Sequence, residues 1–207
     1  MWFARVEQAK AFVDPATESW GLAFTRHVNG ELSAELIGPR LKPMRLDTGI
    51  VGTEYWGVEF QRHVAIRAVN KRDILDVFER LPISDGSFTL GAEQYPIPEY
   101  EKLDVFVAEL EWRQAIVMHA RVAQALAGNL TGYSERSWQR HVTKTTGLTR
   151  KQIEQLERVR YAYHLIRDGH SIAAAAVQAG YADQPHLTRA FRLLRAESPA
   201  QVLARPR

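Results

Sequence analysis

Cysteine is absent from all 207 residues of the chain. Disulfide scaffolds, thiolate metal sites and cysteine nucleophiles are therefore excluded. Long hydrophobic runs are also missing, because no stretch approaches the roughly 20 apolar residues that a transmembrane helix needs. The first residues, MWFAR, lack the basic-then-apolar pattern of a secretion signal. We therefore expect a cytoplasmic protein that has no membrane partner.

The usual signatures of catalysis and of metal binding are missing as well. The chain has no Gly-x-Ser-x-Gly motif of the kind that presents a nucleophilic serine. His27 and His63 each follow an arginine, but a metal site needs convergent ligands and no His-x-His pair accompanies them. We interpret both as ordinary histidines. The sequence therefore predicts a protein that is not an enzyme, with no cofactor and no metal.

What the chain does have is an uneven distribution of charge. Its formal net charge is +3, and its 45% hydrophobic and 25% charged residues are typical of a globular protein of one large or two small domains. Residues 1–112 contain 12 Lys and Arg against 18 Asp and Glu, a net of −6, whereas residues 113–207 contain 15 against 6, a net of +9. This division favours a polyanionic partner for the second half. The alternative is that these charges only solvate the surface.

Residues 1–100 read as a β-rich domain. Alternating apolar residues predict strands at 20–24, 31–37, 55–60 and 88–90. Turn signals separate them at Asn29 and Gly30, Gly38 and Pro39, and Asp85 and Gly86. One short helix is expected near residues 71–81, and the prolines in residues 95–98 indicate an exit linker. Several short strands with one helix suggest a small β-barrel or sandwich.

Residues 101–207 read as an all-α domain, so the fold class is α+β. Leu103, Phe106, Val107 and Leu110 recur at helical spacing, and residues 117–126 form a second amphipathic run that Gly128 can end. A longer helix is expected from Thr149, which opens a capping box with Gln152, to a C-terminal cap at Gly169.

The first helix-turn-helix pattern begins with GYSERSWQRHV at residues 132–142 and closes with TGLT at residues 146–149. Ser134 is a natural N-cap, and Trp138 and Val142, four residues apart, should face the core. The opposite stripe consists of Arg136, Gln139, Arg140 and Thr143. Arginine pairs with guanine edges or phosphates and glutamine with adenine, which makes this stripe a candidate DNA-reading face. The alternative is a solvated polar face.

The second pattern runs from Ser171 and Ile172 through four alanines to GYADQPHLTRAF at residues 180–191. Gly180 can supply the positive φ of a turn, and Asp183 or Gln184 can cap the next helix. Its inner face should consist of Tyr181, Leu187, Phe191 and Leu194. Its outer residues are Gln184, His186, Thr188, Arg189 and Arg192. Because the start of a recognition helix usually enters the groove, Gln184, Thr188 and Arg189 are the expected base readers, and Arg192 and Arg195 the expected phosphate contacts.

These two patterns resemble the DNA-binding region of the AraC family of bacterial transcription regulators, over residues of about 103–203. The first family signature matches Ser134, Trp138, Gln139, Arg140, Thr146 and Gly147. The second matches Ser171, Ile172, Ala176, Gly180, Tyr181, Asp183, Gln184, Leu187, Arg189, Phe191, Ser198 and Pro199. The resemblance implies two helix-turn-helix units joined by a long helix, each reading one of two adjacent major grooves about 34 Å apart.

Three residues depart from the family pattern. Ala196 replaces the usual glycine, so the turn before Ser198 is expected to be reshaped. Pro185 replaces a polar residue, which removes one DNA contact, and Ala175 replaces a larger aliphatic residue, which implies closer packing.

The sequence therefore predicts a sequence-specific transcriptional regulator whose partner is double-stranded DNA. The resemblance adds three expectations, which are a small-molecule effector on the N-terminal domain, a homodimer and contact with RNA polymerase. The rival hypothesis is a ligand-binding or adaptor protein whose helix-turn-helix region does not touch DNA.

Overall fold

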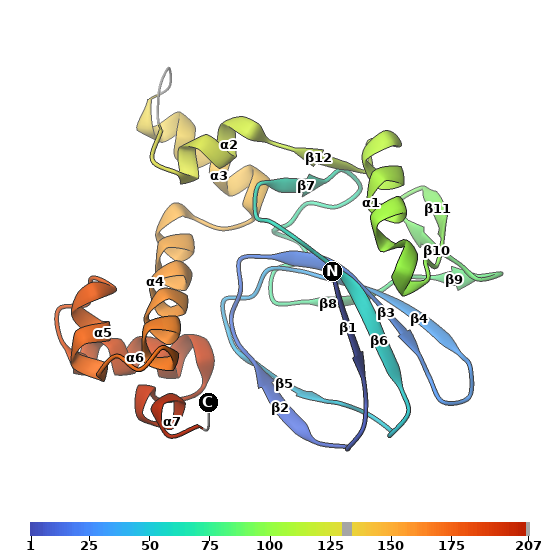
Figure 1. Ribbon diagram of the computed structural model, residues 1–207. Helices are drawn as coiled ribbons and strands as arrows, with labels where there is room; N and C mark the ends of the chain where they lie inside the picture. The colour runs from blue at the N-terminus through green and yellow to red at the C-terminus, as the bar shows by residue number, and fades with distance from the viewer. Residues whose placement is uncertain (130–133, 206–207) are drawn as a thin grey trace.

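The protein is described here by a computed structural model that covers residues 1–129 and 134–205 (Figure 1). The strands are β1 (Trp2–Arg5), β2 (Ala11–Asp14), β3 (Trp20–Arg26), β4 (Leu32–Ile37), β5 (Met44–Asp47), β6 (Glu54–Phe60), β7 (Val64–Ile66), β8 (Phe78–Arg80), β9 (Ile83–Ser84), β10 (Ser87–Leu90), β11 (Glu93–Pro96) and β12 (Ile116–Met118). The helices are the 3-10 helix η1 (Tyr100–Lys102) and α1 (Leu103–Trp112), α2 (Ala120–Leu126), α3 (Glu135–Thr146), α4 (Arg150–Arg167), α5 (Ile172–Gln178), α6 (Gln184–Arg195) and α7 (Pro199–Leu203). The predicted α+β class and all four predicted strands are confirmed.

The largest sheet has five antiparallel strands in the order β1-β6-β3-β4-β8. Its central strand β3 is buried along six of its seven residues, which explains its nearly continuous run of apolar side chains. The sheet has free edges at β1 and β8, so the barrel that the sequence suggested is not formed. Three further small sheets, β11-β10-β9, β12-β7 and β2-β5, surround it.

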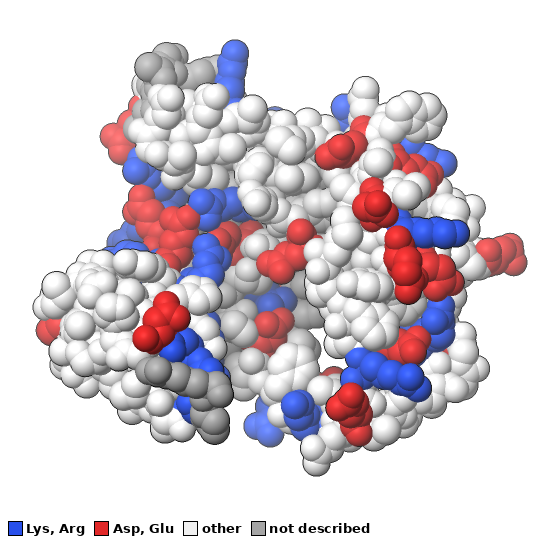
Figure 2. All heavy atoms as spheres, viewed as in Figure 1, with Lys and Arg blue, Asp and Glu red and all other residues white. Residues whose placement is uncertain are grey.

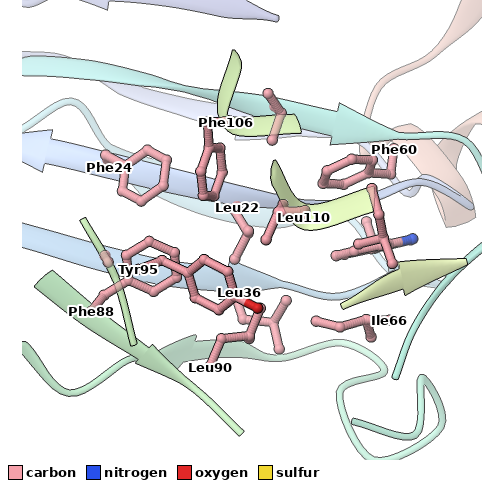
Figure 3. Close-up of a cluster of buried hydrophobic side chains, with 14 of the residues drawn as sticks. Leu22, Phe24, Leu36, Phe60, Ile66, Phe88, Leu90, Tyr95, Phe106 and Leu110 are labelled. Atoms are coloured by element: carbon pink, nitrogen blue, oxygen red, sulfur yellow. The ribbon is translucent and has the colours of Figure 1, made fainter. Parts of the chain in front are cut away.

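An aromatic cluster fills the core beside this sheet (Figure 3). The ring of Phe24 on β3 lies 5.4 Å from Phe88 on β10 and 5.8 Å from Phe106 on α1, measured between centroids. Such tilted and edge-on ring pairs stabilise a core beyond the area they bury. Leu103 and Leu110 of α1 are fully buried in the same cluster. The boundary between two domains at residue 100 stays a prediction. In the structure, α1 packs into the core of the N-terminal strands.

The helix predicted near residues 71–81 is wrong. Residues 71–76 form consecutive turns, Asp76 has a left-handed backbone with φ 58°, and Phe78–Arg80 is the edge strand β8. Ile74, which the helical spacing had placed on one face, is buried against the backbone of Gly38 instead. Pairing with the open edge of β4 therefore outweighs the weak local helical pattern.

Two further boundaries differ from the prediction for a similar reason. Residues 95–98 are not simply a linker, because Tyr95 is buried within the strand β11, and the edge position of β11 tolerates Pro96. The amphipathic run at 117–126 begins as the strand β12, which pairs with β7, and becomes helical only at Ala120. In both places, pairing with another strand determines the secondary structure. The periodicity of the local sequence does not indicate this pairing.

The helical half is organised around α4 (Figure 1). Its 18 residues make a rod about 27 Å long, from 1.5 Å of rise per residue. Helices α2 and α3 lie at one end of this rod and α5, α6 and α7 at the other. Its buried side, which includes Ile153, Leu156, Val159 and Ile166, forms a second core with α5, α6 and α7. The predicted capping box at Thr149 and Gln152 is confirmed.

The two halves touch at several points. Strand β12 leads from α1 into α2 while it pairs with β7 of the N-terminal half. The amide of Ala16 donates to the carbonyl of Leu194 on α6 (2.8 Å). The buried carboxylate of Glu18 pairs with Arg62 (3.2 Å) and with Arg160 on α4 (2.7 Å). Within residues 1–129 and 134–205, no helix has the length and apolar character needed to span a membrane.

Candidate DNA interface

The first motif is built from α2 and α3. From Ser134 onward, the structure of α3 follows the predicted pattern. Ser134 caps α3 by accepting a hydrogen bond from the amide of Ser137 (3.3 Å). Trp138 and Val142 are buried, as expected for the inner face. Gly147 ends the helix in a left-handed conformation, with φ 77°. The preceding Gly132 and Tyr133 lie outside the described residues.

The predicted reading stripe of α3 faces solvent. Arg136, Gln139 and Arg140 are exposed. Thr143 is half-buried, and its hydroxyl donates to the carbonyl of Gln139 (2.8 Å), which fixes the side chain against the helix. Three long side chains with planar donor groups are thus available to base edges within one helical turn.

This stripe lines a groove of about 660 Å³. The groove is lined by Asn70, Arg72, Arg136, Gln139, Arg140, Thr143, Lys144, Thr149, Arg150 and Lys151. Six of these residues are cationic and none is acidic. The positive end of the α4 dipole adds to this field, because the first turn of α4 has no acidic residue. Such a groove attracts anions.

The groove also contains residues that the sequence analysis missed. Asn70 and Arg72 come from the N-terminal half, between β7 and β8, and no motif marks them. Asn70 and Arg72 are held at the groove because Lys71, which lies between them in the sequence, is buried beneath the groove. The ammonium of Lys71 donates to the carbonyls of Arg62 and Val64, and burial lowers its pKa to about 7.

The second motif is formed by α5 and α6. Ser171 caps α5, and the fully buried Ala175 allows the close packing that its small size implied. Gly180 adopts the predicted positive φ, at 73°. Asp183, one of the two predicted caps of α6, accepts from the amide of His186 (2.6 Å), and Pro185 occupies the first turn.

One arginine outside both motifs holds the second turn in place. Arg158 of α4 lies over the ring of Tyr181, with its guanidinium carbon 4.2 Å from the ring centroid. It also donates to the carbonyls of Ala179 (2.9 Å) and Gly180. These contacts satisfy turn carbonyls that the helix leaves unpaired. Sequence spacing gave no signal for this role.

The outer face of α6 is open as well. The side chains at its start and along its outer face, Gln184, His186, Arg189 and Arg192, are exposed. Thr188 is half-buried and donates to the carbonyl of Gln184 (2.9 Å). The inner residues Tyr181, Leu187, Phe191 and Leu194 are buried, as predicted.

Arg195, which the sequence offered as a phosphate contact, is engaged elsewhere. Its guanidinium pairs with Glu197 (2.8 Å) and lies over Tyr163, 3.8 Å from the ring centroid. The turn at Ala196 has the backbone conformation that glycine commonly adopts at the end of a helix. Ala196 takes the left-handed conformation itself, with φ 53°. An L-residue in that conformation is strained relative to glycine.

Figure 2 shows acidic and basic side chains interspersed on the side where α1 and the small sheet β9-β11 lie, and also beside α4. Close to the first motif lie His63 and His119, whose pKa values are lowered, mainly by burial and further by the nearby charge of Lys71. Among the described residues, no group of His, Asp and Glu could hold a metal ion.

Comparison with known proteins assigns the helical half. Residues 128–205 match the model of a family described as a helix-turn-helix domain. The match agrees with the helix-turn-helix patterns of the sequence, and a helix-turn-helix domain is a class of DNA-binding module. The resemblance of the sequence to the AraC family stays a prediction, because the matched residues make up less than half of the chain.

Solved structures of ToxT from Vibrio cholerae are similar over nearly the whole chain. One at 1.65 Å resolution is 11% identical, covers 97% of this chain and 97% of its own, and gives a TM-score of 0.43. A ToxT structure bound to (E)-4-(8-methylnaphthalen-1-yl)but-3-enoic acid is 10% identical, with coverage of 97% and 98% and a TM-score of 0.43. No curated protein sequence matches the chain. The TM-scores lie below 0.5, so the assignment rests on the helix-turn-helix match.

Proposed function

We propose that the protein is a sequence-specific DNA-binding regulator of transcription that reads two adjacent major grooves. One observation carries this proposal, which is that α3 and α6 stand at opposite ends of one rigid helix and both expose their polar stripes. Two recognition helices on a single chain can cover two successive grooves without a partner chain.

Each stripe has side chains suited to reading bases. Arg140 and Gln139 on α3, and Gln184 and Arg189 on α6, can form bidentate pairs with guanine and adenine edges. The cationic residues that surround α3 can bind backbone phosphates, which supply affinity without selectivity. Binding should therefore weaken steeply as salt rises.

A small molecule that binds to the N-terminal half, on the side that faces the helical half, is the proposed means of control. A cavity of about 350 Å³ lies where the halves meet, with Trp20, Leu22 and Arg40 on one side and Val159 and Leu194 on the other. Among residues 1–129 and 134–205, the Nε atom of the buried Arg40 finds no hydrogen-bond partner, although the same guanidinium pairs with Asp14. An effector with an apolar body and a hydrogen-bond acceptor fits this lining.

The direct test is selection of duplexes from a random pool by the full-length protein, followed by titration of the selected site across salt. We expect enrichment of a site with two elements about one helical turn apart, and a strong dependence of affinity on salt. Retention of duplexes without enrichment or salt dependence would instead favour the adaptor hypothesis.

The effector proposal needs its own measurement. Compounds that raise the melting temperature of the protein should also change its affinity for the selected duplex, because they bind where α4 and α6 meet the N-terminal half. Compounds that stabilise the protein and leave DNA affinity unchanged would contradict control through this cavity. The homodimer and the contact with RNA polymerase stay predictions, and light scattering of the protein on its duplex tests the first.

A further inference from the structure

We propose that the N-terminal half contributes directly to the DNA interface, through a phosphate contact made by Arg72. This inference rests on the proposed function, because it assigns a new contact to the same duplex. It concerns the segment of residues 70–73, called here the flanking loop, which belongs to neither helix-turn-helix motif.

The flanking loop and the reading stripe of α3 line one groove. Asn70 and Arg72 lie on the N-terminal side of it, and Gln139 and Arg140 lie on the other. A recognition helix that enters a major groove has a sugar-phosphate backbone on either side of it. A cationic side chain beside the helix therefore meets phosphate and not a base edge.

The loop is held firmly in this position. Lys71 is buried, with an exposed fraction of 2%, and its ammonium donates to two backbone carbonyls. Ile74 is buried at 1% on the other side of the loop. The side chain of Asn70 accepts from the amide of Arg72 (3.1 Å), so the loop backbone is fixed between these two anchors.

The contact to α3 fixes the loop relative to the recognition helix. The Cα of Gly147, at the end of α3, packs so closely on the backbone of Lys71 that an added Cβ would lie 3.0 Å from it. Arg72, which follows Lys71 directly, is therefore held beside α3 with no flexible linker between them. Because the backbone that carries Arg72 is fixed, less conformational entropy is lost on binding than from a flexible loop.

The charge of Arg72 is available to a ligand. Arg72 is exposed and forms no ion pair with residues 1–129 or 134–205. Its exposed neighbour Asp73 is the nearest acidic residue along the chain and does not line the groove. Within the groove, only Arg150 is paired, with Glu154 (2.8 Å), as far as the described residues show. The remaining positive charge favours a polyanion.

The test compares Arg72→Ala with Arg80→Ala, which removes another exposed arginine on the edge strand β8, away from the groove. Both variants are titrated with the selected duplex across salt. We expect Arg72→Ala to weaken binding roughly 3- to 10-fold at moderate salt, equally for matched and mismatched sites. It should also reduce the slope of log affinity against log salt by about 0.9, while Arg80→Ala leaves both unchanged.

Arg140→Ala serves as the reference for the proposed function. If Arg140→Ala loses selectivity and Arg72→Ala binds like the parent protein, the phosphate contact is wrong and the regulator proposal stands. Tighter binding by Arg72→Ala would also overturn the contact, since the loop would then obstruct the duplex. If the parent protein selects no site at all, the proposed function itself fails. Equal melting temperatures of the three variants exclude misfolding as the cause.

Discussion

The two helix-turn-helix motifs are built alike but are set differently in the molecule. Recognition helix α3 ends against the N-terminal half, where Gly147 packs on the backbone of Lys71. Gln184 and His186 at the start of α6 are exposed, and Leu194 near its end accepts a hydrogen bond from Ala16 of the N-terminal half. The first motif therefore lines a groove together with an N-terminal loop, whereas the exposed start of the second recognition helix lies away from this contact.

This difference indicates how one domain could affect the two motifs unequally. A change in the N-terminal half would reach α3 through backbone packing and through the paired strands β7 and β12. It would reach the second motif through the ion pairs of Glu18 and through the end of α6. Arg160, the partner of Glu18 on α4, is partly exposed, which weakens this restraint, whereas tight backbone packing is a firm one. We expect the first motif to be the more strongly coupled.

The largest expected difference is between two glycine substitutions. Gly147→Ala places an L-residue in a left-handed backbone conformation, which costs about 1–2 kcal/mol. The added Cβ also crowds Lys71, so we expect the free energy of unfolding to fall by about 2–4 kcal/mol in total. Gly180→Ala has the same backbone strain, but its nearest neighbour is an Arg158 side chain at 3.7 Å, so about 1–2 kcal/mol is expected. Urea unfolding measures both. Equal losses would mean that α3 is not firmly docked.

The next prediction compares the two reading faces. Arg140→Ala and Arg189→Ala should each cost about 1–3 kcal/mol of binding free energy and relax selectivity, at different base pairs of one site. Competition with singly substituted duplexes locates each effect, and Arg80→Ala is the control. If both variants relaxed the same base pairs, or neither did, the assignment of two reading faces would be wrong.

A pH-dependent effect is expected beneath the first motif, at Lys71. Burial lowers the pKa of Lys71 to about 7 in the folded protein, against 10.5 when it is exposed. Between these pH values the unfolded chain binds more protons, so stability rises with pH, by about 1.4 kcal/mol per unit from this one group. Lys71→Met should lose this part of the slope.

Lys71→Arg provides the matched comparison. Arginine stays charged over the whole range, so its variant should lack the slope but remain destabilised at high pH. Urea unfolding from pH 7 to pH 10 distinguishes the three proteins. An unchanged slope in Lys71→Met would show that the ammonium is not buried as described.

The smallest expected effect lies at the end of the second recognition helix. Ala196→Gly removes the strain of a left-handed alanine and should stabilise the protein by about 0.5–1 kcal/mol, net of the entropy that glycine adds to the unfolded chain. Ala200→Gly, an exposed position within α7, should instead destabilise it by about 1 kcal/mol. Thermal melting of both variants tests whether the turn has the conformation described.

Much of the helical half could be predicted from the sequence, because its signals are local. The caps at Ser134, Thr149 and Asp183 each depend on residues three positions away, and the buried faces follow helical spacing. The N-terminal half was harder to predict. The strand β8 and the strand β12 both looked helical by spacing, and a partner strand distant in sequence decided them.

The sequence by itself determined which side chains each recognition helix turns outward, since 3.6 residues per turn fix the faces of a capped helix. Only the tertiary structure decided that Asn70 and Arg72 stand beside α3 and that Arg195 is held by Glu197 and Tyr163. Contacts of this kind join residues with no fixed spacing along the chain. They depend on how the two halves pack together, and no local pattern records that packing.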